Sequence, residues 1–507
     1  MRVVLYSSIF ALAFFALSCV KPLDEQQTEL PEATNTWLLS SDDDINNYTS
    51  FNPVNTYTLF MAKGETEHVQ LVINTDSNKE LDIVRKADQD APDFLCRKLA
   101  VFDGMEDVLV PCHTKVKPDK KTVKLWLSYT TTLTSKAGSY SDYISLKSET
   151  AEYIVKITVT VKDVEIPSTP SIPAVFGINP ATFDDTGLSS TEKVAQRKEV
   201  SDLLLSYRIS PYFCTWIAGT MVLECTSSPY PVTSNECWEY MKDPRFKAVA
   251  LPSANLSDEE LGNMLSKARS EGLLGKAYFY LWDEPTRMEE YEKLRGKADR
   301  IHQLAPEAKI LTTYYCGPKD GPYKDNLFAV WPILRGATSI FCTGVWSLQG
   351  NESRSEMCRT NLQDGEEWWC YVCMSDYPGL AANSAGIPNR MIMLREWKEK
   401  SQGFLFWVVN AFSSLSPLSP RSDLPKGDGC LVFPGKPFGV EAPCVSVRLE
   451  RWRDGAEDYE LLVNYENVLG RNAAEDMLKN VYQSPGAFTT NTKYVKSFHK
   501  HLIIDVL

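Results

Sequence analysis

Two adjacent carboxylates, Asp283 and Glu284, follow a short apolar segment in the sequence Tyr280-Leu-Trp-Asp-Glu-Pro285. Glycoside hydrolysis requires such a pair, because one carboxyl group protonates the leaving oxygen while the other stabilises or attacks the anomeric carbon. A neighbouring negative charge and partial burial would raise the pKa of the acid, so that it keeps its proton near neutral pH. Asp-Glu-Pro is also a common helix start, since the helix dipole favours acidic residues there. The tripeptide alone leaves both interpretations open.

The orientation of this pair depends on where the preceding strand ends. The segment 276–282 has the pattern of a buried strand, and Pro285 is expected to be the first residue of the next helix. Successive residues of a regular strand point to opposite faces, so Asp283 would point outward if Tyr280 and Glu284 pointed inward. We therefore expect the strand to end at Asp283 and the Asp-Glu-Pro corner to turn both carboxylates to one side.

Aromatic residues and one amide lie at or just beyond the ends of other predicted strands. Flat rings pack against the apolar faces of pyranose rings, so we predict that these residues contact a sugar, although any one of them is more often a core residue. The candidates are Trp216, Trp282, Tyr314, Tyr315, Trp346, Trp369, Tyr371 and Trp407, with Asn410 as a hydrogen-bonding amide.

Other catalytic chemistries lack the residues that they need. The histidines are His68, His113, His302, His499 and His501. Only His302 lies in the region around the carboxylate pair, inside a predicted helix, so a Ser-His-Asp relay and a His-rich zinc site are disfavoured. We expect no metal and no cofactor. The formal net charge of −13 argues against a nucleic-acid partner, because phosphate binding needs a basic face.

The elements around the pair alternate between short apolar strands and helices. The predicted strands cover 174–179, 208–212, 248–253, 276–282, 308–313, 339–344, 367–373 and 403–409. The clearest helix runs from Arg287 to Ala305, with apolar residues at three- and four-residue steps, and a last helix covers about Val445 to Val468. This alternation predicts a (β/α)8 TIM-like barrel over 174–475, with catalytic groups at the C-terminal ends of its strands.

The chain is predicted to be multidomain, with an antiparallel β-sandwich at 36–166 before the barrel. Short β-type runs alternate there with polar turns, as in Tyr153–Val161. The segment 167–173 contains three prolines and is predicted to be a stiff linker. Residues 476–507 are expected to form a C-terminal extension that packs on the barrel.

The first residues have the features of a lipoprotein signal peptide. A positive start, an apolar run and Ala16-Leu-Ser-Cys19 resemble the signal and lipobox of bacterial lipoproteins, with Cys19 as the lipidated residue. The apolar run is shorter than a membrane-spanning helix requires. We expect residues 1–19 to be the signal peptide with its lipobox cysteine, and cleavage to occur before Cys19. Residues 20–35 are expected to be a polar tether. The protein is expected to be lipid-anchored in the bacterial cell envelope, periplasmic or outer-surface. Ordinary cleavage near Ser18 without a lipid is the alternative.

Twelve further cysteines suit a compartment that permits disulfides. Pairs close in sequence are Cys96 with Cys112, Cys225 with Cys237, and Cys430 with Cys444. Cys370 and Cys373 form a lone Cys-x-x-Cys inside a predicted strand, for which core packing is favoured over metal binding.

Several separated segments together resemble glycoside hydrolase family 123. They are Arg208-Ile-Ser-Pro-Tyr212, the Tyr280 to Pro285 segment, Ala305-Pro306, Leu311-Thr-Thr313, Gly403-Phe-Leu-Phe-Trp407 with Asn410, Arg448 to Tyr459, and, in the predicted sandwich, Lys63 to Gln70 and Ala137-Gly-Ser-Tyr140. The segment Ser339–Trp346 departs from the family, because it lacks the Asp and the Trp-Val-Pro that many relatives have.

The resemblance implies a retaining exo-acting hydrolase that removes terminal β-linked N-acetylgalactosamine from glycolipids or oligosaccharides. Catalysis would be substrate-assisted: Glu284 would be the general acid and base, and Asp283 would orient and stabilise the 2-acetamido group that attacks the anomeric carbon. The role of Arg453–Tyr459 is expected to be a structural salt-bridge network. Alternatives are a β-glycosidase of other sugar specificity and a non-catalytic glycan-binding surface lipoprotein. No oligomeric state is predicted.

Overall fold

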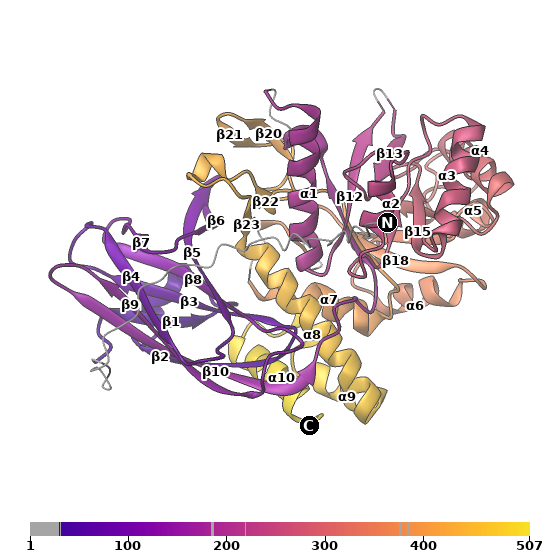
Figure 1. The fold of residues 1–507 in the computed structure, drawn as a ribbon. Coiled ribbons are helices and arrows are strands. Elements are labelled where there is room, and N and C mark those ends of the chain that lie inside the picture. The colour runs from indigo at the N-terminus through magenta and orange to yellow at the C-terminus, as the bar shows by residue number, and fades with distance from the viewer. Residues whose placement is uncertain (1–29, 31, 184–186, 218–219, 375–377, 383–385) are drawn as a thin grey trace, which may run out of the picture.

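The structure is a computed structural model that describes part of the chain, shown in Figure 1. The described residues are 30, 32–183, 187–217, 220–374, 378–382 and 386–507. The predicted signal peptide, Cys19 and most of the predicted tether lie outside them. Within the described ranges, no helix combines the length and the apolar character needed to cross a membrane.

The N-terminal region consists of two packed β-sheets, as the sequence predicts for its β-rich character. Its strands are β1 (Thr36–Ser40), β2 (Thr56–Lys63), β3 (Thr66–Asn74), β4 (Leu81–Ala87), β5 (Asp93–Phe102), β6 (Met105–Pro111), β7 (Lys115–Val116), β8 (Thr122–Thr130), β9 (Gly138–Lys147) and β10 (Glu152–Glu165). One sheet has the order β2-β10-β9-β4-β7, and the other begins β1-β3-β8-β5-β6. Neighbouring strands are antiparallel except β2 and β10, which are parallel, so the prediction of a wholly antiparallel sandwich is wrong at this pair. Alternate apolar residues such as Leu71, Leu125, Ile144 and Ile157 fill the space between the sheets.

The second sheet is completed by strands from far along the chain. β22 (Val432–Phe433) and β23 (Cys444–Ser446) extend it in the order β6-β23-β22, with Val445 opposite Leu109. Main-chain hydrogen bonds therefore join the N-terminal region to the C-terminal half.

The C-terminal half is built on a nearly closed nine-stranded mixed sheet. Its strands are β11 (Ala174–Ile178), β12 (Ser210–Trp216), β13 (Leu223–Thr226), β14 (Val249–Ala250), β15 (Ala277–Tyr280), β16 (Lys309–Tyr314), β17 (Ile340–Gly344), β18 (Glu367–Val372) and β19 (Phe404–Phe406). The order is β13-β12-β11-β19-β18-β17-β16-β15-β14, and every neighbouring pair is parallel except β12 with β13. Each of the eight predicted strand segments overlaps one parallel strand.

The ninth strand, β13, departs from the prediction of an eightfold barrel. It folds back antiparallel from β12 and faces the far end of the sheet, where the Ser227 amide donates to the Ala250 carbonyl at 3.0 Å and the Leu223 amide donates to the Leu281 carbonyl at 3.4 Å. The ring of strands is therefore nearly closed by a hairpin strand, and the (β/α)8 prediction is confirmed only in this coarser form.

Helices follow the parallel strands. They are α1 (Ser190–Ser206), α2 (Asn235–Met241), α3 (Asp258–Ser270), α4 (Met288–Leu304), α5 (Val330–Leu334), α6 (Glu352–Thr360) and α7 (Ile387–Glu399), and the chain ends with α8 (Val447–Leu469), α9 (Arg471–Leu478) and α10 (Thr492–Ile504). Short 3-10 helices are η1 (Ile45–Ser50), η2 (Pro180–Thr182), η3 (Leu274–Lys276), η4 (Leu327–Ala329), η5 (Val345–Leu348) and η7 (Lys436–Phe438), and small hairpins are β20 (Phe412–Leu415) with β21 (Leu418–Pro420) and β24 (Tyr482–Ser484) with β25 (Ala487–Phe488).

Two helix predictions agree with the structure and one is wrong. Helix α4 begins after its cap Arg287 and ends before its cap Ala305, and α8 covers the predicted last helix. Pro285, however, is not the first helical residue, because the backbone stays irregular until Met288. This loop gives the preceding acidic residues freedom to leave the strand geometry.

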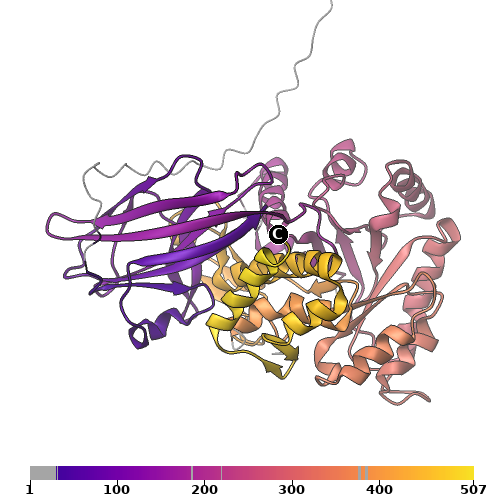
Figure 2. The same ribbon diagram turned by 90° about the horizontal axis from the view of Figure 1, so that it is seen from below.

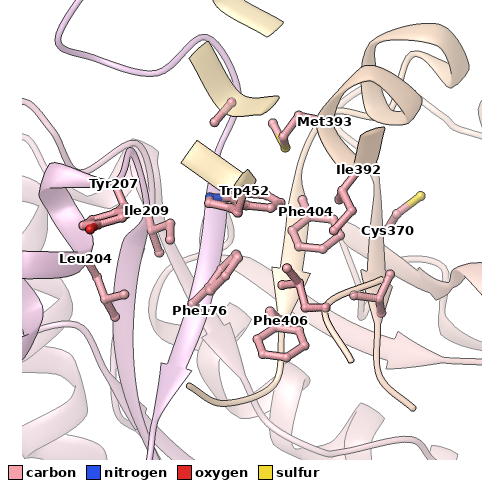
Figure 3. Packing of buried hydrophobic residues seen from close by; sticks show 14 of the residues in the cluster. Phe176, Leu204, Tyr207, Ile209, Cys370, Ile392, Met393, Phe404, Phe406 and Trp452 are labelled. Atoms are coloured by element: carbon pink, nitrogen blue, oxygen red, sulfur yellow. The ribbon is translucent and has the colours of Figure 1, made fainter. Parts of the chain in front are cut away.

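Helix α8 lies between the two halves of the molecule. Figure 2 shows the C-terminal helices between the N-terminal sheets and the nine-stranded sheet. Trp452 of α8 packs its ring 4.8 Å from Phe176 and 5.0 Å from Phe404, centroid to centroid, on the outer face of the nine-stranded sheet (Figure 3). Helix α10 contacts α8 and also β2 and β10 of the N-terminal region.

The charged segment of α8 forms a buried ion-pair network. Arg390 of α7 contacts Asp458 at 2.6 Å and Asp454 at 3.5 Å, while Glu450 pairs with Arg97 of β5 and with Arg453. All of these side chains are almost fully buried. The network ties α8 to α7 and to the N-terminal sheet, in line with the structural role expected for Arg453–Tyr459.

Of the predicted pairs of neighbouring cysteines, the structure brings one together and separates another. The sulfurs of Cys96 and Cys112 lie 3.5 Å apart, whereas the sulfur of Cys225 lies 3.0 Å from that of Cys214 across the β12–β13 hairpin. The prediction that Cys225 neighbours Cys237 is wrong, because Cys237 lies in α2, in the core between the sheet and its helices.

Replacing Gly455 with alanine should lower the free energy of unfolding by about 1–3 kcal/mol, because a Cβ there would lie 2.2 Å from the Arg390 carbonyl oxygen and would separate α7 from α8. Gly296→Ala, in the exposed part of α4, is the matched control: a Cβ there meets nothing within 4 Å, so the change should stabilise by about 0.5–1 kcal/mol. Denaturant unfolding measures both. Equal stability of the two variants would contradict close packing at Gly455.

Candidate active site

The carboxylate pair lies directly beyond β15, where the strand alternation changes. Tyr280 belongs to the core enclosed by the nine-stranded sheet, whereas Leu281 and Trp282 both belong to the core between the sheet and its helices. Two successive residues thus face outward, and Asp283 follows in a bend that turns back toward the enclosed side. The strand ends slightly earlier than the sequence suggests, and this is what turns Asp283 inward.

Glu284 adopts a left-handed backbone conformation with φ of 45°. This conformation costs a non-glycine residue roughly 1–2 kcal/mol, and such strain concentrates at functional sites. The Glu284 amide donates to the Thr313 hydroxyl at 3.3 Å, which ties the strained corner to the end of β16. The local geometry therefore places Glu284 beside Asp283 without continuing a strand.

Two hydroxyl groups hold the Asp283 carboxylate. Tyr280 donates to Asp283 Oδ1 at 2.9 Å, and Thr313 approaches the same oxygen at 3.4 Å. Burial raises the pKa of Asp283, while hydrogen bonds from Tyr280, Thr313 and Trp216 act in the opposite direction. Because these groups donate to the carboxylate, they fix its orientation and favour its charged form.

Glu284 has a different environment. The Tyr371 hydroxyl donates to Glu284 Oε1. Burial and the neighbouring charge of Asp283 raise the pKa of Glu284 to about 7, against the opposing effects of Tyr371 and Lys319. Near neutral pH this carboxyl group therefore carries a proton in a substantial fraction of molecules, as a general acid must.

Aromatic side chains continue from Glu284 along one side of the site. The Trp346 ring meets Tyr371 edge-on with centroids 5.1 Å apart, and Tyr315 lies 6.1 Å from Trp346. Tyr315 and Trp346 are only partly buried. The Lys319 ammonium lies 5.5 Å from the Tyr315 ring centre. Four of the predicted sugar contacts thus lie next to the catalytic candidates: Tyr315, Trp346 and Tyr371 on the side of Glu284, and Trp216 beside Asp283.

Other predicted sugar contacts lie elsewhere. Trp282 is buried under the helices, and Tyr314 is fully buried with its ring 5.7 Å from Trp331. Trp369 is buried inside the sheet, where its indole donates to Glu367 at 2.9 Å near the start of β18. The structure does not bring these three residues to the carboxylate pair.

Asn410 and Trp407 lie beyond β19. Asn410 is fully buried; it accepts from the Asn179 amide at 2.8 Å and donates to the Asn179 carbonyl at 2.7 Å. The Asn410 side-chain amide thus joins the ends of β11 and β19. These hydrogen bonds indicate a structural role for Asn410 instead of the predicted contact with a sugar hydroxyl. Trp407 is half-buried, and its carbonyl packs against Gly177, where a Cβ would lie 1.9 Å away.

Sequence reasoning missed the residues that hold the carboxylates. Tyr280 and Thr313 were parts of predicted strands with no assigned role. Thr313 is a hydroxyl residue at the end of a predicted strand, which is a usable signal, since strand ends meet at one edge of such a sheet.

A third carboxylate, Asp428, was also missed. It is buried, which raises its pKa, and it accepts from the Met374 amide at 3.2 Å. Burial and the charges of Glu284, Asp428 and Asp283 together raise the pKa of the Cys373 thiol. Asp428 also lines a surface hollow of about 400 Å³ together with Arg421 and Lys426.

Comparison with known proteins identifies the region around this site. Residues 254–464, which include the carboxylate pair and most of α8, match the family model described as glycoside hydrolase 123, catalytic domain. No significant match exists among curated protein sequences.

Solved structures extend the comparison to the fold. A family 123 glycoside hydrolase from Clostridium perfringens, studied for glycolipid glycan hydrolysis, matches with a TM-score of 0.67 at 13% identity, over 93% of this chain and 97% of that one. A β-galacturonidase from Eisenbergiella tayi matches with a TM-score of 0.34 at 9% identity, over 77% of this chain and 68% of that one. The first likeness shows a shared fold across nearly the whole chain. Residues 254–464 therefore carry a catalytic domain of glycoside hydrolase family 123, which confirms the resemblance that the sequence motifs indicate.

Proposed function

We propose that the protein is a retaining exo-glycoside hydrolase that removes terminal β-linked N-acetylgalactosamine by substrate-assisted catalysis. The observation that carries this proposal is the unequal environment of the pair. Burial and the charge of Asp283 raise the pKa of Glu284 to about 7, whereas the rise that burial gives the pKa of Asp283 is opposed by hydroxyl donors that favour its carboxylate form. Unequal environments assign unequal roles to two neighbouring acids. The glycolipid substrate studied for the Clostridium perfringens structure suggests a glycan end as the natural target.

In the first step Glu284 donates its proton to the glycosidic oxygen as the bond to the anomeric carbon breaks. The amide oxygen of the 2-acetamido group attacks that carbon from the opposite face, forming a cyclic oxazolinium ion. Asp283 accepts the amide hydrogen bond and stabilises the developing positive charge. Since neither carboxylate attacks carbon, the two residues can be adjacent in the sequence, unlike a nucleophile and acid on opposite faces of the ring.

In the second step Glu284 takes a proton from water, and the oxygen of that water attacks the anomeric carbon. The ring of the intermediate opens, the acetamido group is restored, and the product keeps its β configuration. Glu284 ends protonated and ready for another cycle. Tyr315 and Trp346 are positioned to pack against the sugar ring.

The proposal is tested with protein that begins at residue 20 and a panel of aryl β-glycosides. We expect cleavage of the N-acetylgalactosaminide, and inhibition by a thiazoline that mimics the cyclised intermediate. Equal cleavage of the aryl β-galactoside would exclude substrate assistance and favour another β-glycosidase mechanism. Binding of glycans without turnover of any member of the panel would favour the non-catalytic alternative.

Tyr371→Phe should raise the pKa of Glu284, because the hydrogen bond from Tyr371 lowers it in the native protein. A general acid is active while protonated, so activity falls as pH rises through its pKa. The variant should therefore keep activity to higher pH than the native enzyme. A pH profile of kcat/KM measures the shift, and an alkaline limb that stays in place or moves to lower pH would contradict this role for Tyr371.

We also propose that Cys19 is lipidated and that the protein is anchored in the bacterial cell envelope. The support is the signal and lipobox pattern in the sequence. Cys19→Ala should move the protein from the membrane fraction to the soluble fraction, and an unchanged distribution would contradict the anchor.

Domain limits are proposed at 36–166 for a β-sandwich and 174–475 for a modified (β/α)8 barrel. Strands β1–β10 and β11–β19 fall within these limits, which supports them, whereas β22 and β23 lie within 174–475 but extend the second N-terminal sheet.

A further inference from the structure

A buried group of metal-binding side chains lies far from the carboxylate pair, where α10 packs against the N-terminal sheets. Glu65 lies in the turn between β2 and β3, Glu67 lies in β3, and His499 lies in α10. One ligand atom from each comes within 4.8 Å of the others. His499 Nε2 is 3.6 Å from Glu65 Oε1 and 3.6 Å from Glu67 Oε1. The three residues are 1%, 7% and 5% exposed.

Two of these atoms lack a hydrogen bond. Within the described residues, neither Glu65 Oε1 nor Glu67 Oε1 accepts one, although both are buried. Glu65 Oε2 accepts from the Ala62 amide at 2.6 Å, and Arg390 Nη2 lies 3.6 Å from Glu67 Oε1, beyond hydrogen-bond range. Buried carboxylate oxygens without a donor are costly, so two of them aimed at one imidazole nitrogen point to a cation between them.

The imidazole of His499 is oriented as in many metal sites. Its Nδ1 lies 2.9 Å from Asp458 Oδ1, and its Nε2 lies 3.1 Å from the Phe60 carbonyl oxygen. A carboxylate that accepts from one ring nitrogen fixes the tautomer and directs the other nitrogen toward the metal. The Phe60 carbonyl is available as a fourth ligand on the same side.

The local charges fit a divalent ion. Arg390 contacts Asp458 at 2.6 Å and 3.0 Å, and the same guanidinium lies 3.4 Å from Asp42, 3.5 Å from Asp454 and 3.6 Å from Glu67, so these carboxylates share its one charge. Among the described residues, Glu65 has no ion-pair partner other than His499, which it shares with Glu67. A divalent cation would balance both carboxylates when they are ionised.

The ligand set and spacing favour zinc. Zinc binds imidazole nitrogen and carboxylate oxygen at about 2.0–2.2 Å in tetrahedral sites, which separates neighbouring ligand atoms by roughly 3.4 Å. The measured separations from Nε2 are 3.6, 3.6 and 3.1 Å. We propose that Glu65, Glu67, His499 and the Phe60 carbonyl bind a structural zinc ion that fastens α10 to the N-terminal sheets.

This site differs from the sequence-based expectation of no metal. The ligands come from opposite ends of the chain, so no local spacing reveals them. A doubly protonated His499, bonded through Nδ1 to Asp458 and through Nε2 to the Phe60 carbonyl, is the competing occupant. Zinc must displace the proton on Nε2, so zinc uptake should release a proton to the buffer.

The test measures zinc in the full folded protein, purified, depleted with a chelator and reloaded with zinc chloride. We expect one zinc ion per chain by elemental analysis, proton release on titration calorimetry, and a melting temperature that rises by several degrees with zinc. No zinc retained after reloading, with an unchanged melting temperature, would leave the protonated histidine as the occupant and overturn the proposal.

Variants locate the ion. Glu65→Gln and His499→Gln should each weaken zinc binding by about 100-fold or more, because each removes a direct ligand. His501→Gln is the matched control, since His501 lies on the same helix but its side chain is 45% exposed. If the two ligand variants do not fold, the chelation and reloading of the native protein still decide the result. Full zinc binding by a folded His499→Gln variant would place the ion elsewhere.

Discussion

Replacing Glu284 with glutamine should lower kcat/KM by about 10²–10⁴-fold for a β-glycoside with a poor leaving group. The glutamine keeps the shape of the side chain and can accept the Tyr371 hydrogen bond, but it has no proton to donate to the glycosidic oxygen. For an activated aryl leaving group the loss should be much smaller in the first step, because such a group departs without protonation. The ratio of the two losses therefore reports general-acid catalysis.

The pH profile adds an independent measurement. Burial and the charge of Asp283 raise the pKa of Glu284 to about 7, so the protonated form is present below that pH and is lost above it. Native activity on the poor leaving group should decline as pH rises through about 7, and this limb should vanish in Glu284→Gln. The exposed Glu292 of α4 provides a control, Glu292→Gln, that should leave both rates unchanged. Equal losses for good and poor leaving groups would contradict the acid role.

The parallel strands could be predicted because each is an apolar run with a helix after it, and all eight predicted runs overlap a parallel strand. β13 could not, because Leu223–Thr226 is a strand only through its pairing with β12 and its contacts across the gap to β14 and β15. The prediction that Pro285 begins a helix is wrong for a related reason. The sequence around Pro285 fits a helix start, but the chain first adopts a left-handed conformation at Glu284, and the helix begins at Met288.

The aromatic candidates show where strand-end position stops being informative. Tyr314 and Tyr315 are neighbours at the end of β16, yet Tyr314 faces the helices and Tyr315 lies beside Trp346. Which of two neighbours faces the site depends on the last ladder bond of the strand, and that register is set by tertiary pairing. The same question arises for Asp283. Leu281 and Trp282 before it both face outward, and Asp283 then turns inward.

Replacing Asp283 with asparagine should lower kcat/KM by about 10²–10⁴-fold for good and poor leaving groups alike. Asp283 is proposed to act on the acetamido group, and cyclisation must occur whatever group departs. Asparagine fits the space and can still accept from Tyr280 and Thr313, but it has no charge to stabilise the oxazolinium ion. The loss should therefore appear in kcat, with little change in KM, because the charge develops only in the transition state.

Substrates with a less nucleophilic amide provide the decisive comparison for Asp283. Changing the N-acetyl group to N-trifluoroacetyl should slow the native enzyme strongly, since the amide oxygen is the nucleophile. The exposed Asp299 of α4 gives the matched control, and Asp299→Asn should behave as the native enzyme does. If the native rate is insensitive to the amide substituent while Asp283→Asn is still inactive, Asp283 acts directly on the sugar ring. Substrate assistance would then have to be replaced by a mechanism with a protein nucleophile.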